Sequence, residues 1–312
     1  MTKNPFTNAR VVSENTEPSV YHNNQFRRGD PKFVMSRSEL KIFARCPHKW
    51  IAGFHEDESD SKEWGTLCDL MLLQPHLVQA KIAVPDENYV NEKGEEKPWN
   101  NNAKVCREWN QQQEDAGRMV VKSAKFGEAR AAIEILMGDP INADVVQCSK
   151  HQVYCVADYT DEKTEIVVPV KILIDLVPDK AHVLLGKTLI DFKTCADGSH
   201  ANWAREVKKW GYDTQAALYL DVYRASTGED RVEFRHLLQE SEAPYEVGRR
   251  TMSDDPEDMA SFISLGRESY RLALARYCRC LEKNEWPGYD TFGPIDGWTP
   301  VQPELWMLKG QP

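Results

Sequence analysis

The chain has 312 residues, and its 39 Lys and Arg against 49 Asp and Glu give a formal net charge of −10. It contains no apolar run near the roughly 18 residues of a membrane span and no basic-then-apolar start, so we expect a soluble, cytoplasmic protein without a membrane partner. The acidic balance argues against non-specific coating of nucleic acid, because Lys and Arg supply the affinity for phosphates, but it allows an enzyme with a local basic surface.

The first thirty residues are polar and charged and have no apolar period. We therefore expect residues 1–31 to form an extended or disordered N-terminal arm, and residues 32–312 to form a single domain. Eight cysteines are spread along the chain without the spacing of a small disulfide-linked domain. They are expected to be reduced thiols.

A helix is predicted to begin at Ser36, because Ser36 and Glu39 have the spacing of a capping box, and to end before Pro47. A basic residue recurs every fourth position from its start: Arg37, Lys41, Arg45 and Lys49. Such a stripe is either an ordinary solvated face or a surface for DNA.

A second, largely buried helix is predicted over residues 64–73, closed by Pro75. Asp69 is unusual there, because a carboxylate in so apolar a segment must be paired, solvated or bound to a cation. The composition then becomes polar, and we expect a polar helical excursion around 91–140, in which helical spacing resumes over 120–137.

Runs of β-branched residues separated by turn signals predict three strands at 145–156, 166–177 and 183–192. They are followed by a helix over 202–224 with a break at Gly211, a strand at 232–238 and a long amphipathic helix at 257–283. Helices before, within and after one block of strands predict a single α/β domain, with a central mixed β-sheet flanked by helices.

The chemically informative segment is the third of these strands. Asp191 and Lys193 are two residues apart and should share one face of the strand, while Phe192 enters the core on the other. Asp175 ends the preceding strand, and a hairpin after it could bring the two aspartates side by side. Converging carboxylates suit Mg²⁺ or Mn²⁺. An ordinary surface Asp–Lys pair is the alternative, although two charges on a mostly buried strand favour a function.

Gln215 and Tyr219 are spaced i, i+4 on the helix that follows and share one face. They could reach a phosphate or a water beside the metal. Without the strand pair, a solvated helix face would be the simpler interpretation.

Taken in order, these residues resemble a known family. A D-x-K strand preceded by an Asp-bearing strand and followed by a Q-x-x-x-Y helix resembles the PD-(D/E)XK nuclease superfamily, with its restriction-endonuclease-like core. The ordered set resembles more narrowly the phage-type exonucleases of the exonuclease VIII (RecE) group. The resemblance runs from about Met35 onward through Ser36-Arg37-Ser38-Glu39-Leu40, Trp64-Gly65-Thr66, Leu72-Leu73-Gln74-Pro75, Lys171 with Ile174-Asp175, Asp191-Phe192-Lys193-Thr194, Gly211-Tyr212, Gln215-Ala216-Ala217 with Tyr219, and Trp286-Pro287-Gly288.

The resemblance implies roles for individual residues. Two Mg²⁺ ions, with Mn²⁺ as a substitute, would be held mainly by Asp175 and Asp191, and Lys193 would assist the attacking water. Gln215 and Tyr219 would support the site and the DNA. The basic residues expected to contact the DNA backbone are Arg37, Lys41, Arg45, Lys49, Arg205, Lys208 and Lys209.

Two features depart from the family pattern. The early helix usually carries a His after G-T-x-x, where this chain has Asp69, which we expect to keep a metal-binding role. Gln152 and Glu165 are further candidates to complete the metal shell. Cys46 resembles the first ligand of the iron–sulfur members, but Cys278 and Cys280 lack the matching spacing, so no cluster is expected.

The resemblance implies a metal-dependent 5′→3′ exonuclease that acts on the ends of linear double-stranded DNA and leaves 3′ single strands for recombination. It also implies a ring-shaped homo-oligomer, a single-strand annealing protein as partner, and a phage or prophage origin in a bacterial host cell. A structure-specific or end-trimming endonuclease is an alternative. A second alternative is an inactive nuclease fold that binds DNA or a partner, although such proteins usually lose a metal carboxylate or the Lys.

Overall fold

The computed structural model of the chain describes residues 4–55, 60–254, 261–289 and 291. The strands are β1 (Phe6–Ser13), β2 (Met35–Ser36), β3 (Ile82–Ala83), β4 (Asn88–Val90), β5 (Glu96–Pro98), β6 (Met119–Val120), β7 (Ser149–Thr160), β8 (Val167–Pro178), β9 (Thr188–Cys195), β10 (Glu233–Glu240) and β11 (Val247–Ser253). The helices are α1 (Pro18–His22), α2 (Arg37–Arg45), α3 (Pro47–Ile51), α4 (Asp60–Leu73), the 3₁₀ turn η1 (Pro75–Leu77), α5 (Val78–Lys81), α6 (Lys104–Asp115), α7 (Ser123–Gly138), α8 (Pro140–Gln147), α9 (His200–Trp210), α10 (Tyr212–Thr227) and α11 (Phe262–Lys283).

A seven-stranded mixed sheet organises the chain, in the order β1-β7-β8-β9-β10-β11, with the short β2 also paired to β8. Strands β7, β8 and β9 are joined by antiparallel pairing, β9 and β10 are parallel, and β11 returns antiparallel to β10. Because α9 and α10 lie between β9 and β10 in sequence, they form the crossover that a parallel pair requires. The predicted fold class, a central mixed sheet flanked by helices, is confirmed.

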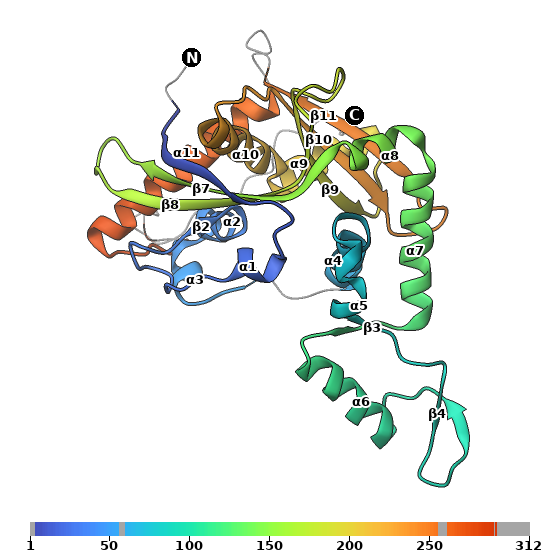
Figure 1. Cartoon of the computed structure of the whole chain (residues 1–312). Helices are drawn as coiled ribbons and strands as arrows, with labels where there is room; N and C mark the ends of the chain where they lie inside the picture. Colours follow the sequence, from blue (N-terminus) through green and yellow to red (C-terminus); the bar gives the residue numbers. More distant parts are fainter. Residues whose placement is uncertain (1–3, 56–59, 255–260, 290, 292–312) are drawn as a thin grey trace, which may run out of the picture.

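Two hydrophobic clusters cover the sheet. One joins α2, α3, α10 and α11 to the long strands β7 and β8, and the other joins α4, α7 and α8 to the ends of β8, β9 and β10. Figure 1 shows α10 and α11 on one side of the sheet and α4 on the other. The strands that carry Asp175 and Asp191 therefore run between two packed helical layers.

The N-terminal segment, expected to be extended or disordered, is ordered from residue 4 onward. Strand β1 pairs antiparallel with β7 and closes one edge of the sheet. Helix α1 follows, and its buried Tyr21 packs edge-on against Tyr154 of β7. The pairing of β1 with β7 was not predicted from the polar composition of this segment, because an edge strand needs few apolar side chains.

Several local predictions agree with the structure. The Ser36 hydroxyl accepts a hydrogen bond from the Glu39 amide at 3.3 Å and caps α2. The Glu39 carboxylate, however, accepts hydrogen bonds from Arg28 and from the Trp50 indole instead of returning to the cap. Gly211, at φ +70, separates α9 from α10 at the predicted break, because glycine adopts the left-handed conformation without steric cost.

Other boundaries were predicted wrongly. The strand expected at 183–192 begins at Thr188, and residues 183–187 belong to the preceding turn, where Val183 and Leu184 are exposed. The apolar residues Val145 and Val146, assigned to a strand, lie on α8. A short apolar run fits a buried helix as well as a strand, so only tertiary packing distinguishes them. Strand β11 was not predicted. The first residues of the helix predicted at 257–283 lie outside the described residues.

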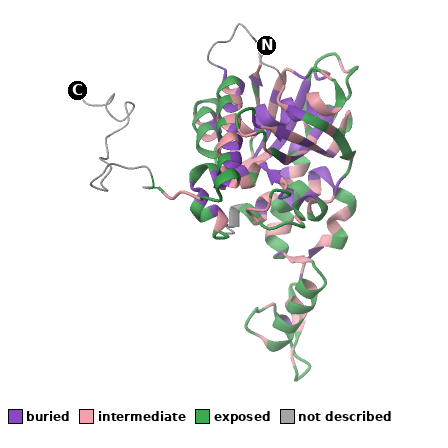
Figure 2. Cartoon of the chain, turned by 90° about the vertical axis from the view of Figure 1, so that its left-hand side faces the viewer, coloured by how far each residue is buried: buried purple, intermediate pink, exposed green. Residues whose placement is uncertain are grey.

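The polar excursion is shorter than expected. Strands β4 and β5 and helix α6 form an arm that extends away from the sheet and is mostly exposed or half-buried (Figures 1 and 2). Helix α7, expected to be part of the excursion, packs on α4 through Ala129, Ala132 and Leu136. Within the described residues, no helix is both long and apolar enough to cross a membrane.

Candidate active site

The site is centred on β9. Asp191 is 2% exposed, and its carboxylate lies 2.6 Å from the Lys193 ammonium on the same face of the strand. Phe192, between them, is buried in the opposite cluster with α4 and α7. This is the arrangement that the two-residue period predicted, and it places an acid and an ammonium together inside the fold rather than on its surface.

Asp175 reaches this pair from β8. Leu176 and Ile190 are register partners of β8 and β9, and the Phe192 amide donates a hydrogen bond of 3.0 Å to Oδ2 of Asp175. The hairpin therefore brings Asp175 beside the Asp191 strand, as expected. Desolvation and then the negative charge of Asp191 raise the pKa of Asp175 well above its ordinary value, although Lys193 opposes the shift.

Asp69 approaches from α4. Gly65, one turn earlier, lies close to β9: a Cβ there would stand 3.2 Å from the Thr194 hydroxyl. Asp69 is exposed by its surface area, yet the protein packed around it desolvates it enough to raise its pKa to about 7. Its charge interacts with Lys193 and Asp191. The helix thus adds a third carboxylate to the site.

Helix α10 supplies the predicted glutamine and tyrosine. The Gln215 amide donates a hydrogen bond of 2.6 Å to Oδ1 of Asp191. Tyr219 is buried one turn later, and desolvation, then Tyr21, Asp191 and Asp175, raise its pKa well above the ordinary value. Tyr21 of the N-terminal segment is a hydrogen-bond neighbour of Tyr219.

Lys193 remains a cation in these surroundings. Burial alone would lower its pKa, but Asp191 and Asp175 outweigh burial and raise it. The ammonium also lies 5.5 Å from the centre of the Tyr212 ring. A lysine held as a cation can stabilise negative charge beside it.

His236 is a neighbour that the sequence did not indicate. It is the register partner of Asp191 on β10, is 1% exposed and packs against Trp203 and Tyr212. Desolvation lowers its pKa to about 4, so the ring is neutral at pH 7. An alternating strand pattern with one internal His is too common a signal to have identified it.

Part of the predicted basic surface converges near this site. Arg37 lies over the Tyr212 ring and donates a hydrogen bond to the Trp210 carbonyl. The ammonium groups of Lys41 and Lys209 lie 5.0 and 4.8 Å from the centre of the Trp210 ring. Helices α2 and α9 therefore bring Arg37, Lys41 and Lys209 together. Arg37 lies beside Tyr212, whose ring also contacts Lys193.

The remaining basic residues do not form one stripe. Helix α2 ends at Arg45, because Cys46 is extended and Pro47 starts α3, so Lys49 lies on a different helix and contacts the rings of Phe54 and Tyr289. Lys208 is ion-paired with the buried Asp213 at 2.7 Å. Arg45 and Arg205 are exposed. The expectation of one basic stripe from Arg37 to Lys49 along a single helix was wrong.

Of the two other candidates for the metal shell, Gln152 lies at the site and Glu165 does not. Gln152 contacts Asp175 through a hydrogen bond of 3.2 Å. Glu165 is exposed in the turn before β8, ten positions from Asp175 along an extended strand, which corresponds to about 30 Å. Glu165 is therefore not part of this site.

A divalent cation fits the chemistry of the three aspartates. Asp69, Asp175 and Asp191 face a single ammonium, and Oδ2 of Asp191 has no hydrogen-bond donor among the described residues beyond its ion pair with Lys193. Two of these carboxyl groups have raised pKa values, mainly through desolvation and also through the charge of Asp191. Hard oxygen ligands with excess negative charge suit Mg²⁺ or Mn²⁺.

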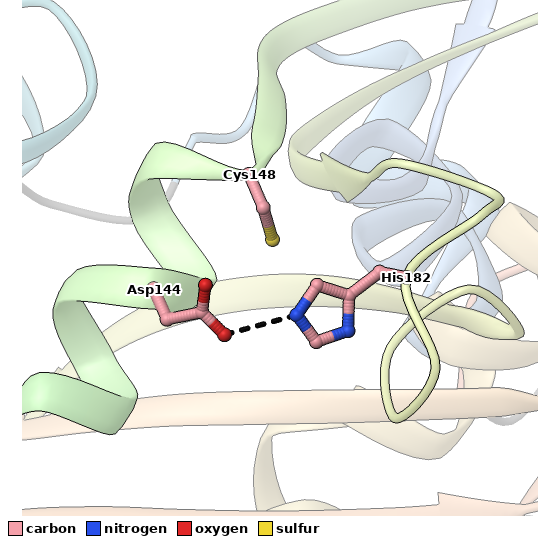
Figure 3. Close-up of side chains that lie close together, drawn as sticks. All are labelled: Asp144, Cys148 and His182. Atoms are coloured by element: carbon pink, nitrogen blue, oxygen red, sulfur yellow. Dashed lines mark hydrogen bonds and ion pairs between the residues drawn. The ribbon is translucent and has the colours of Figure 1, made fainter.

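A second group of potential ligands lies elsewhere. The side chains of Asp144, Cys148 and His182 have ligand atoms within 4.8 Å of one another (Figure 3). However, the amides of Leu184 and Leu185 donate to Nδ1 of His182, while Nε2 lies 2.9 Å from Asp144. The ring therefore carries its proton on Nε2 and cannot offer that nitrogen to a metal. The group holds the turn before β9.

Comparisons with known proteins agree with the fold class. Residues 36–292 match a family described as a PDDEXK-like domain of unknown function (DUF3799). A crystal structure of a protein from Eubacterium rectale, named as a putative exonuclease, aligns with a TM-score of 0.54 at 15% sequence identity, over 95% of this chain and 98% of that chain. At that identity the likeness shows a shared fold. No curated protein matches the chain in sequence.

Proposed function

Because this chain belongs to the PDDEXK-like domain family DUF3799, we propose that it is a metal-dependent nuclease that hydrolyses phosphodiester bonds of DNA. The observation that carries the proposal is the ion pair between the buried Asp191 and the half-buried Lys193, with Asp175 held beside it by the Phe192 amide. One buried acid with a half-buried ammonium and a half-buried second acid on adjoining strands costs stability, and such groups cluster at functional sites.

The residues have distinct roles in the proposed reaction. Asp175 and Asp191, with Asp69, would hold divalent cations, which supply a more acidic water and positive charge beside the phosphate. Lys193 stabilises the attacking hydroxide and the charge that develops on the phosphate oxygens. Gln215 fixes Oδ1 of Asp191, while Oδ2 pairs with Lys193.

The finer parts of the proposal concern the substrate. We infer an exonuclease that degrades linear duplex DNA from 5′ ends, with the backbone passing along Arg37, Lys41 and Lys209. The cations over Trp210 and Tyr212 support this path, since backbone contacts come mainly from Lys and Arg. The ring-shaped oligomer, the annealing partner, the RecE-type recombination role and the phage origin stay predictions that rest on the sequence resemblance.

The test is digestion of end-labelled linear duplex DNA with Mg²⁺ or Mn²⁺. We expect Asp191→Asn and Lys193→Ala each to lower the cleavage rate by at least about 100-fold, because each removes a charge at the reacting phosphate. Asp158→Asn is the matched control: this aspartate lies on β7, and its carboxylate accepts a hydrogen bond from the Asn8 side chain. It should cleave like the parent.

Parent-like cleavage by both site variants would rule out the assignment. A duplex labelled at one end of one strand decides the polarity. A covalently closed circle separates the two enzyme alternatives, because a strict exonuclease leaves it intact whereas an endonuclease cuts it. Absence of both cleavage and Mn²⁺ binding in calorimetry would favour the inactive DNA- or partner-binding module.

A further inference from the structure

Gln152 has an unusual backbone for a residue inside a strand. It lies in the middle of β7, with regular antiparallel pairs on both sides of it, yet its φ is +46. Residues other than glycine enter this left-handed region at a cost in free energy, and they persist there only when their surroundings hold them. The side chain is 5% exposed. A buried, strained residue beside the site suggests a functional use.

The side chain points to one carboxylate. The Gln152 amide nitrogen donates a hydrogen bond of 3.2 Å to Oδ1 of Asp175, while the Phe192 amide donates 3.0 Å to Oδ2. Each oxygen of Asp175 thus accepts one fixed donor. This leaves the other lone pairs of the carboxylate in a defined direction.

The N-terminal segment holds this backbone in place. The Asn15 and Thr16 amides donate to the carbonyls of His151 and Gln152. The buried Gln74, directly after α4, donates its side-chain amide to the Thr16 carbonyl. The strained residue is therefore fixed from outside the strand, by a segment that also contacts the end of the helix carrying Asp69.

We propose that Gln152 is a positioning residue for the metal site: the left-handed backbone of β7 aims its carboxamide at Asp175 and orients that carboxylate toward the cation. Groups that hydrogen-bond to metal-ligating side chains orient those ligands, and their loss typically lowers metal affinity or activity roughly 10–100-fold. The inference rests on the proposed function only in taking Asp175 as a metal ligand.

The test uses Gln152→Met, which keeps the length of the side chain and removes the N–H donor. We expect the Mn²⁺ dissociation constant measured by calorimetry on the full chain to rise roughly 10–100-fold. The Mn²⁺ concentration for half-maximal cleavage should rise in parallel, while cleavage at saturating Mn²⁺ returns to within a few-fold of the parent. A purely structural defect would not be rescued by added cation.

Gln239→Met is the matched control. Gln239 is also a buried glutamine in a strand, but its amide donates to the Tyr245 carbonyl at 2.8 Å. This variant should lose thermal stability and keep the Mn²⁺ affinity of the parent. If Gln152→Met does not fold, Gln152→Asn replaces it, because asparagine tolerates the left-handed backbone but is too short to reach Asp175.

The outcomes separate the two proposals. Parent-like Mn²⁺ affinity in the folded Gln152 variant overturns the positioning role while leaving the nuclease assignment intact. A parent that binds Mn²⁺ in a Gln152-dependent manner but cleaves no DNA overturns the nuclease assignment and keeps the positioning role. A parent that binds no Mn²⁺ overturns both.

Discussion

Asp69 and Asp175 show how the surrounding protein changes the pKa of a carboxyl group. Desolvation raises the pKa of Asp69 to about 7 and that of Asp175 well above its ordinary value; the charge of Asp191 adds to both shifts and Lys193 opposes them. A raised folded-state pKa means that the protonated acid is favoured in the native fold. Its stabilising contribution is complete below the unfolded pKa and is lost as the pH rises through the folded pKa. Without a bound cation, the contribution of Asp69 and Asp175 to the free energy of unfolding therefore decreases as the pH rises.

Metal affinity should show the opposite dependence on pH. A cation must displace the proton on Asp69, so we expect the Mn²⁺ affinity to rise between pH 6 and 7, by up to about tenfold per pH unit. The rise due to Asp69 should flatten above pH 7. Calorimetry across this range measures it, and buffers of different ionisation enthalpy count the protons released.

Asp69→Asn provides the comparison. This variant should bind Mn²⁺ more weakly and release fewer protons near pH 7, whereas Asp158→Asn should follow the parent. A parent whose affinity is constant from pH 6 to 8 would contradict the raised pKa values.

At the scale of elements, the position of α10 depends on a close crossing with α11. A Cβ on Gly266 of α11 would lie 2.0 Å from the Asp213 carbonyl, so only glycine permits the two backbones to approach. Asp213 is buried, pairs with Lys208 and lies two residues before Gln215. The position of the Gln215 amide over Asp191 therefore depends on a glycine in another helix.

Gly266→Ala should destabilise the protein by about 1–3 kcal/mol or more, because the backbones must separate. Gly127→Ala is the matched control within α7, where a Cβ meets nothing within 4 Å. It should stabilise by about 0.5–1 kcal/mol through the lower backbone entropy of alanine. Urea unfolding measures both, and equal stability of the two variants would contradict the close crossing.

At the scale of the whole molecule, the N-terminal segment is part of the domain although the family match begins at residue 36. Besides β1, it accepts hydrogen bonds from the buried Lys171 ammonium through the Tyr21 and Asn23 carbonyls. Burial lowers the pKa of Lys171, so the two carbonyl acceptors stabilise an ammonium group that has lost part of its hydration. The exposed arm of β4, β5 and α6 has no comparable burial in the sheet (Figure 2).

Deleting residues 1–23 should therefore abolish cooperative unfolding or cause aggregation, because β7 becomes an open edge and Lys171 loses both carbonyl acceptors. Replacing residues 86–116 of the arm by a Gly/Ser linker of about eight residues should preserve the fold. Thermal melting and size-exclusion chromatography compare the two deletions. A well-folded N-terminal deletion would show that the segment is dispensable.

Features that depend on neighbours in sequence were predictable. The period of a strand places Asp191 and Lys193 on one face, a hydroxyl at Ser36 caps a helix, and Gly211 ends one. These are local consequences of backbone geometry and hydrogen bonding. The fold class followed from the order of such segments.

Only the tertiary structure decided what distant segments do. The approach of α4 brings Asp69 to a strand more than a hundred positions away, β7 gives a polar N-terminal segment a partner, and the Asn15 and Thr16 amides help to hold Gln152 in a conformation that no propensity favours. Long-range pairing and burial set the free energy of these features, and neither is encoded in a local pattern. The sequence by itself thus determined the acid–lysine strand, while the tertiary structure determined which other groups surround it.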